Sequence, residues 1–135
     1  MASEWSRLYG DETLTTRPGA DSAAVAHAGE RLGRHLPAGL AELYAESDGV
    51  FDELGQWWII WPLDMLVQEN TARWAVGVLP TRLLAFGDDG TGDAFGLEGD
   101  QPDIVCWHPI DDASVHLAPD LHTFWDRWVS GDLET

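Results

Sequence analysis

The feature that most constrains the fold is the segment 82–118, in which four short apolar runs alternate with turns rich in Gly, Asp and Pro. Each run has the length of a strand, and the intervals between them suit hairpins rather than helical crossovers. The segment therefore predicts an antiparallel sheet whose strands follow one another along the chain. The predicted strands are residues 82–86, 93–97, 104–108 and 114–118.

The turn between the first two of these strands is the most distinctive, with the sequence Gly87-Asp88-Asp89-Gly90-Thr91-Gly92-Asp93. Asp side chains can accept hydrogen bonds from the backbone just ahead of them, and Gly tolerates positive φ, so the segment predicts a hairpin tip. Phe86 and Phe95 flank the turn and are expected to meet across the two strands. Three neighbouring carboxylates repel one another, so the tip is either well solvated or faces a cation or a basic partner.

The remaining elements are predicted from periodicity. Residues 57–61 are aromatic and β-branched and end at Pro62, which predicts a fifth strand. Residues 1–18, with Trp5 and Leu8, have weak periodicity and predict a loosely packed N-terminal arm. Helices are expected over about residues 22–34, 37–48, 62–74 and 119–130, the last having a wide apolar face at helical spacing.

These elements define the expected architecture. We predict an α+β fold with an N-terminal helix pair and an antiparallel sheet of about five strands. Helices, including the amphipathic C-terminal one, are expected to cover one face of the sheet. At 135 residues, with no linker or repeat, the chain is predicted to be a single domain over residues 1–135.

The charge balance narrows the choice of partners. The chain has 24 acidic residues against seven arginines and no lysine, a net charge of −17. This field repels nucleic acid and anionic lipid and attracts cationic partners, so neither a nucleic-acid nor a membrane partner is expected. Many Ala, Gly, Arg and Asp without Lys are also typical of a GC-rich genome. The acidity therefore has two explanations, one functional and one compositional.

Three features of the sequence indicate the cellular compartment of the protein. Cys106, the one cysteine, lies in an apolar run and excludes an internal disulfide, which favours a buried thiol in a reducing compartment. The N-terminus has no basic segment followed by an apolar run. No apolar stretch approaches the roughly 20 residues of a membrane-spanning helix. A cytoplasmic location is expected.

The sequence predicts neither catalytic nor metal-binding residues, and no cofactor. The apolar neighbours of Cys106 raise a thiol pKa rather than lower it, and Asp111 and Asp112, being adjacent, point apart. The acidic turn fails the calcium-loop spacing, and its glycines lack the lysine of a phosphate loop. The five histidines have no partner at short-range ligand spacing and are expected at the surface or at strand ends. They are His27, His35, His108, His116 and His122.

Trp57 and Trp58 are candidate binding residues. In a strand over 57–61 they point to opposite faces, so one enters the core. The other is either covered by a helix or exposed as an anchor for a partner, a role for which Trp is favoured.

Several local motifs follow one another in a distinctive order along the chain. They are Leu36-Pro37-Ala38-Gly39-Leu40, Asp48-Gly49, Trp61-Pro62-Leu63-Asp64, Phe86-Gly87-Asp88-Asp89-Gly90 with Gly92-Asp93-Ala94-Phe95, and Ile104-Val105-Cys106-Trp107-His108, followed by the aromatic helix of Leu121 and Trp128. In these motifs and their order the chain resembles the SUKH superfamily, which includes the fungal cell-wall assembly regulator and many bacterial immunity proteins. The resemblance spans residues 21–130, and the Trp-rich run 57–61 departs from the family pattern.

The resemblance implies a non-enzymatic immunity protein that binds a cognate protein toxin, which is often a nuclease in this family. An acidic surface would complement the basic surface of such a toxin. The alternative that the resemblance leaves open is a regulatory or scaffold module. Open sheet edges allow either a monomer or a weak homodimer. The residues predicted to bind the partner are Asp88, Asp89, Asp93, Asp111, Asp112, Trp57 and Trp58.

Overall fold

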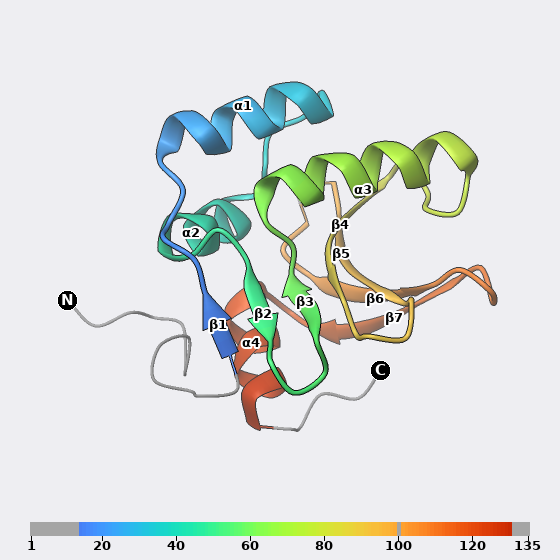
Figure 1. Ribbon diagram of the computed structural model, residues 1–135. Coiled ribbons are helices and arrows are strands. Elements are labelled where there is room, and N and C mark those ends of the chain that lie inside the picture. Colours follow the sequence, from blue (N-terminus) through green and yellow to red (C-terminus); the bar gives the residue numbers. More distant parts are fainter. Residues whose placement is uncertain (1–13, 100, 131–135) are drawn as a thin grey trace.

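The computed structural model describes residues 14–99 and 101–130 of the chain (Figure 1). Helices and strands are mixed along the chain, and the described part has an α+β architecture. The helices are α1 (Ser22–Leu32), α2 (Ala38–Glu46), α3 (Leu63–Val76) and α4 (Leu121–Ser130). The strands are β1 (Leu14–Thr16), β2 (Val50–Asp52), β3 (Trp57–Ile60), β4 (Leu83–Asp88), β5 (Ala94–Glu98), β6 (Ile104–His108) and β7 (Ala113–Ala118).

The strands form two antiparallel sheets. One has the order β1-β2-β3, and the other is a meander with the order β4-β5-β6-β7. The expectation of about five strands in one sheet is therefore wrong, although each of the five predicted strands is present. β1 and β2 were the strands that the sequence did not predict, because three residues are too few to establish a period-two pattern.

The two sheets meet where β3 runs beside the outer edge of β4. The Trp61 backbone N–H donates to the Phe86 carbonyl over 2.8 Å, and the Trp57 indole donates to the Asp88 carbonyl over 3.0 Å. Here the backbones approach so closely that a Cβ added at Gly87 would lie 1.7 Å from the Ile59 carbonyl oxygen. The glycine of the acidic hairpin is thus required for the junction of the sheets.

Helix α3 supplies hydrogen-bond partners to Leu83 and Ala85 on this edge of β4. The buried Asn70 side chain accepts from the Ala85 N–H over 2.8 Å and donates to the Ala85 carbonyl over 2.7 Å. The Trp74 indole donates to the Leu83 carbonyl over 2.9 Å. Polar groups of β4 that would otherwise template another strand are therefore bonded within the chain.

Helix α4 closes the core against both sheets. Phe124 contacts Phe86 and Phe95 with ring centroids 5.6 and 4.9 Å apart, and Trp128 contacts Trp57 of β3 over 6.2 Å. The predicted contact between Phe86 and Phe95 is confirmed, with centroids 6.3 Å apart. The predicted apolar face of the C-terminal helix is thus the face that packs.

The helices do not all cover one face as predicted. Cys106 and Trp107 are neighbours on β6 and point to opposite faces of the sheet. Cys106 pairs with Phe95, on the α4 side, whereas the Trp107 indole donates to the Val78 carbonyl just after α3. Helix α3 thus follows the β4 edge and leads into a segment that covers the other face.

The predicted N-terminal helix pair exists as α1 and α2, but α1 makes its larger contact with α3 (Figure 1). The predicted loose arm is wrong for residues 14–16, because β1 pairs with β2 in the register Leu14 to Asp52. The remaining residues of that arm, Trp5 and Leu8 among them, lie outside the described residues.

The Asp-Gly motif after α2 orients the next helix. The Asp48 carboxylate accepts from the Leu63 N–H over 2.7 Å and so caps α3, whose preceding residue is a proline without a capping side chain. No helix in the described part of the chain is both long and apolar enough to cross a bilayer.

Asp120 caps α4, and its replacement should weaken the fold. Its carboxylate accepts from the Thr123 N–H over 2.8 Å, and this backbone bond is the main reason that the pKa of Asp120 lies below its usual value. We expect Asp120→Ala to lower the free energy of unfolding by about 1 kcal/mol at neutral pH, measured by urea denaturation. Because the folded-state pKa is the lower one, the contribution is present above the unfolded pKa and is lost as pH falls through the folded value.

Asp120→Asn is the matched control for that prediction, because an amide oxygen keeps the cap without the charge. At neutral pH it should lose less stability than Asp120→Ala, because it keeps the cap and loses only the part that depends on charge. An equal loss for both variants would show that charge rather than capping stabilises α4.

Candidate functional site

Three hairpin turns lie at one end of the two sheets (Figure 1). In an antiparallel meander the β4–β5 and β6–β7 turns share an end, and Trp57 at the start of β3 bonds to Asp88 at the end of β4. We call these turns, residues 52–56, 88–93 and 109–112, the hairpin-tip surface. Three segments far apart in sequence thus form one candidate interface.

Two side-chain contacts join the three turns. The Trp57 indole links the first turn to the second through the Asp88 carbonyl. The Asp93 carboxylate and the His108 imidazole lie 2.8 Å apart and link the second turn to the end of β6. The turns are therefore held relative to one another, which reduces the entropy lost when a partner binds.

The acidic residues of the middle turn stabilise the turn itself through hydrogen bonds to its backbone. The Asp88 carboxylate accepts from the Gly90 N–H over 2.8 Å, and the Asp89 carboxylate accepts from the Thr91 N–H over 2.9 Å. Both residues, like Asp93, are half-buried. The turn chemistry predicted from the sequence is confirmed, and the structure brings Asp88, Asp89 and Asp93 together in one tip.

Three of the four residues of the third turn are exposed to solvent. Asp111 and Asp112 are exposed, and Asp112 has a positive φ of 50°. Ile110 beside them is 99% exposed, and Leu54 at the first turn is 80% exposed. The two aliphatic residues were not among the predicted site residues. They could have been identified from the sequence, because an aliphatic residue within a tight turn is rarely buried in the core.

The hairpin-tip surface carries charge of one sign. Asp52 and Glu53 add to the carboxylates of the other two turns, and the three turns contain no lysine or arginine. Arg82 lies at the opposite end of β4, and Arg34 donates to the Thr81 carbonyl there. The surface therefore combines a negative field with two exposed aliphatic side chains.

The predicted aromatic anchors are both half-buried. Trp57 packs edge-on against Trp128, and its indole N–H is bonded to Asp88. Trp58 packs edge-on against Phe51 with ring centroids 5.1 Å apart. Trp57 thus lies at the hairpin-tip surface as part of its support, and Trp58 lies on the opposite face of β3.

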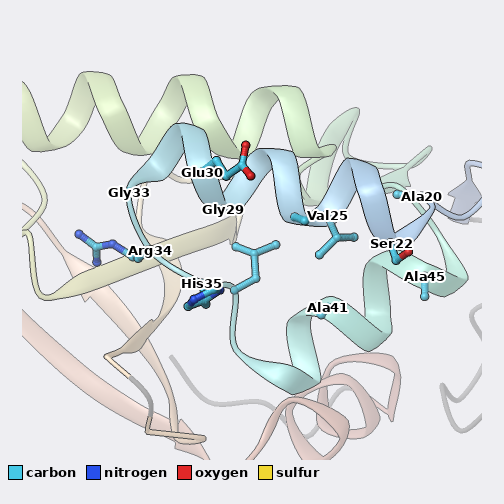
Figure 2. A pocket seen from close by; sticks show the side chains of 12 residues that line it. Ala20, Ser22, Val25, Gly29, Glu30, Gly33, Arg34, His35, Ala41 and Ala45 are labelled. Carbon is cyan, nitrogen blue, oxygen red and sulfur yellow. The ribbon is translucent and has the colours of Figure 1, made fainter.

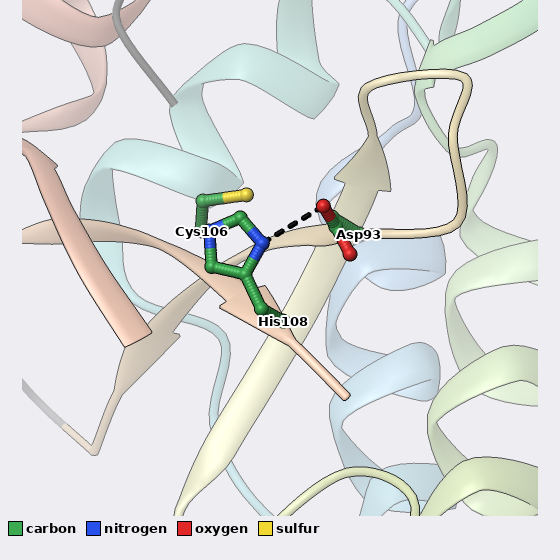
Figure 3. Close-up of side chains that lie close together, drawn as sticks. All are labelled: Asp93, Cys106 and His108. Atoms are coloured by element: carbon green, nitrogen blue, oxygen red, sulfur yellow. Dashed lines mark hydrogen bonds and ion pairs between the residues drawn. The ribbon is translucent and has the colours of Figure 1, made fainter. Parts of the chain in front are cut away.

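Asp93, Cys106 and His108 converge beneath the middle turn (Figure 3). One ligand atom from each lies within 4.8 Å of the others. Burial, and then Asp89 and Asp93, raise the pKa of the Cys106 thiol to about 12, so the thiol is protonated at neutral pH. The three residue types match a thiol-dependent hydrolase, but a nucleophilic cysteine needs a lowered pKa. The predicted direction of the Cys106 shift is confirmed.

A groove lies elsewhere, between α1 and α2 (Figure 2). It has a volume of about 590 Å³ and is lined mostly by small apolar residues, among them Val25, Gly29 and Ala41. Arg34 and His35 lie at one end of it (Figure 2). No residue from the hairpin-tip surface lines this groove.

The helix-flanked meander, the Asp48 cap and the glycine at the sheet junction belong to a small α+β domain. The chain belongs to the SMI1/KNR4 family (SUKH-1), whose model matches residues 19–127. This confirms the resemblance over nearly the same range. Comparison with curated proteins found no match.

Proposed function

We propose that the protein is a non-enzymatic immunity protein that binds and neutralises a cognate toxin through the hairpin-tip surface. The observation that carries the proposal is the alignment of three acidic turns at one end of the fold. The family is consistent with either a toxin-immunity or a regulatory role. The acidic surface favours the first of these.

The physical argument concerns encounter and selectivity. A toxin that cleaves nucleic acid presents positive charge to phosphates, and a carboxylate surface competes for the same groups. Charge complementarity accelerates association and rejects acidic partners. Ile110 and Leu54 would supply apolar contacts within the charged surface, because both are exposed and each lies on a turn.

Three further features of the proposal follow from the residues. The protonated thiol of Cys106 and the absence of a matching sequence motif favour binding rather than catalysis. A buried free cysteine is stable in a reducing compartment, which supports a cytoplasmic protein. The net charge of −17 disfavours nucleic acid as the direct partner.

The proposal is tested by titrating the full chain against the toxin domain encoded beside it, with calorimetry at low and at physiological salt. We expect tight binding that weakens as salt rises, and loss of toxin activity at equimolar inhibitor. Absence of binding at low salt would refute the proposal.

The third turn should control the association rate. We expect the double variant Asp111→Asn/Asp112→Asn to slow association with the toxin by about tenfold at low salt and to flatten its salt dependence, since both carboxylates are exposed. The measurement is surface plasmon resonance. Glu30→Gln/Asp64→Asn is the matched control, because it removes the same charge from exposed positions on the helices. Equal slowing by both variants would show that net charge, not this surface, guides association.

A second candidate function is regulatory, and the groove between α1 and α2 favours it. Small apolar residues there leave room for an extended or helical segment of a cellular partner. Val25→Trp would fill that groove. If Val25→Trp abolishes partner binding while the turn variants do not, the regulatory role replaces the immunity role.

A further inference from the structure

We propose that Asp93, Cys106 and His108 form a binding site for a transition-metal dication of the zinc class. The site joins the middle hairpin turn to β6 and needs no partner protein. It shares Asp93 with the hairpin-tip surface, but its test uses a metal ion alone and does not depend on the proposed toxin-binding function.

The register of the sheet creates the site. Cys106 and His108 are two residues apart on β6, so their side chains leave the same face. Ala94 pairs with Trp107, which places the preceding Asp93 across from His108. The Asp93 carboxylate lies 2.8 Å from the His108 Nδ1, and the Cys106 Sγ lies within 4.8 Å of both partners' ligand atoms (Figure 3).

Only small movements are needed to bind a metal. Zinc bonds of about 2.3 Å to sulfur and 2.0 Å to nitrogen or oxygen, at tetrahedral angles, place ligand atoms about 3.5 Å apart. The sulfur must therefore approach its partners by roughly 1 Å, and the carboxylate and imidazole must separate by somewhat less than that. Side-chain rotation supplies such shifts without a change in the backbone.

The ligand set selects the metal. Thiolate and imidazole favour zinc and related ions, whereas calcium and magnesium require oxygen ligands. The two side chains toward solvent are partly exposed, 29% for Asp93 and 20% for His108, so an ion can enter past them to the buried sulfur. Three protein ligands leave a fourth position for water.

Binding exchanges a proton for the metal. The Cys106 S–H bond breaks, the proton passes to the buffer, and the thiolate sulfur bonds the dication. The thiolate and the Asp93 carboxylate then balance the charge of the ion. Burial is the main cause of the raised pKa of the metal-free thiol, and the carboxylates of Asp89 and Asp93 raise it further. The same two carboxylates favour a bound cation.

The probe is Co²⁺ added to the full chain under reducing conditions without phosphate. We expect equimolar binding with sulfur-to-cobalt charge-transfer absorption in the near ultraviolet and visible bands of a four-coordinate ion. Zn²⁺ should displace the cobalt and raise the melting temperature. A pH indicator in weak buffer should record a proton released for each ion bound.

Variants assign the ligands. Cys106→Ser should abolish the charge-transfer band, and His108→Gln and Asp93→Asn should each weaken cobalt binding by about tenfold or more. His116→Gln is the matched control, because His116 forms another His–Asp pair, 3.0 Å from Asp103, that is not grouped with the cysteine. Circular dichroism verifies that each variant is folded. The cobalt titration of the unmodified chain tests the site even if a variant does not fold.

Two outcomes would overturn the proposal. One is the absence of a charge-transfer band in the unmodified, reduced chain at millimolar Co²⁺. The other is a band that His116→Gln removes as fully as His108→Gln, which would indicate non-specific binding to surface histidines.

Discussion

Gly87→Ala should lower the free energy of unfolding by about 3 kcal/mol or more, measured by urea denaturation. A Cβ at this position would lie 1.7 Å from the Ile59 carbonyl oxygen and 2.8 Å from the Ile59 carbonyl carbon. Backbone atoms cannot rotate away as the end of a long side chain can. Relief therefore requires β3 and β4 to separate, which also strains the hydrogen bond from Trp61 to Phe86.

Gly92→Ala is the matched control, because the two glycines are needed for different reasons. Gly92 has open space around the added Cβ but a φ of 104°, which L side chains rarely adopt. We expect a loss of about 1–2 kcal/mol for Gly92→Ala, arising only from backbone strain. If Gly87→Ala is no worse than Gly92→Ala, the close approach of the two sheets is not a requirement of the fold.

Gly87 also shows why part of the fold could not be predicted from the sequence. The Phe-Gly-Asp-Asp motif is a local signal, and it placed a hairpin tip correctly because turn chemistry acts over a few residues. The contact that makes the glycine necessary involves Ile59, far away in the chain. The pairing of β1 with β2 has the same origin, since three-residue strands are stabilised by their neighbours rather than by propensity.

The cluster of Asp93, Cys106 and His108 shows why a site can also be missed when only the sequence is known. A search for ligands at short spacing in the chain does not find it, because Asp93 belongs to a different strand end from the other two. The alternation of β6 and the predicted hairpins were sufficient to place Cys106 and His108 on one face. The register between β5 and β6 was the missing information.

The hairpin-tip surface could be predicted from the sequence in part. Asp111 and Asp112 were predicted to lie in a loop, and the structure exposes both. That the β4–β5 and β6–β7 turns share one end follows from antiparallel order, which the strand spacing alone predicts. The position of the first turn depends on the junction of β3 with β4, which no local pattern in the sequence encodes.

Asn70→Leu is the second substitution expected to have a large effect, about 3 kcal/mol off the free energy of unfolding. The Asn70 side chain is fully buried and bonds the Ala85 N–H and carbonyl and the Leu66 carbonyl. Leucine has a similar size but no polar atoms. The cost therefore comes from the Ala85 groups, which lose their partner in a site that water does not reach.

The neighbouring Gln68→Leu is the control for helix propensity and hydrophobicity. Gln68 is exposed on the same helix, so this substitution should change stability by about 0.5 kcal/mol or less.

Asn70→Asp tests the same site through the pH dependence of stability. A buried carboxyl is neutral when protonated and can then both donate to and accept from Ala85, whereas ionisation leaves a buried charge. Its folded-state pKa is raised, so the penalty should be large at neutral pH and should vanish as pH falls below the unfolded value. A loss for Asn70→Asp that does not change with pH, or an Asn70→Leu variant as stable as Gln68→Leu, would mean that the β4 edge does not depend on this amide.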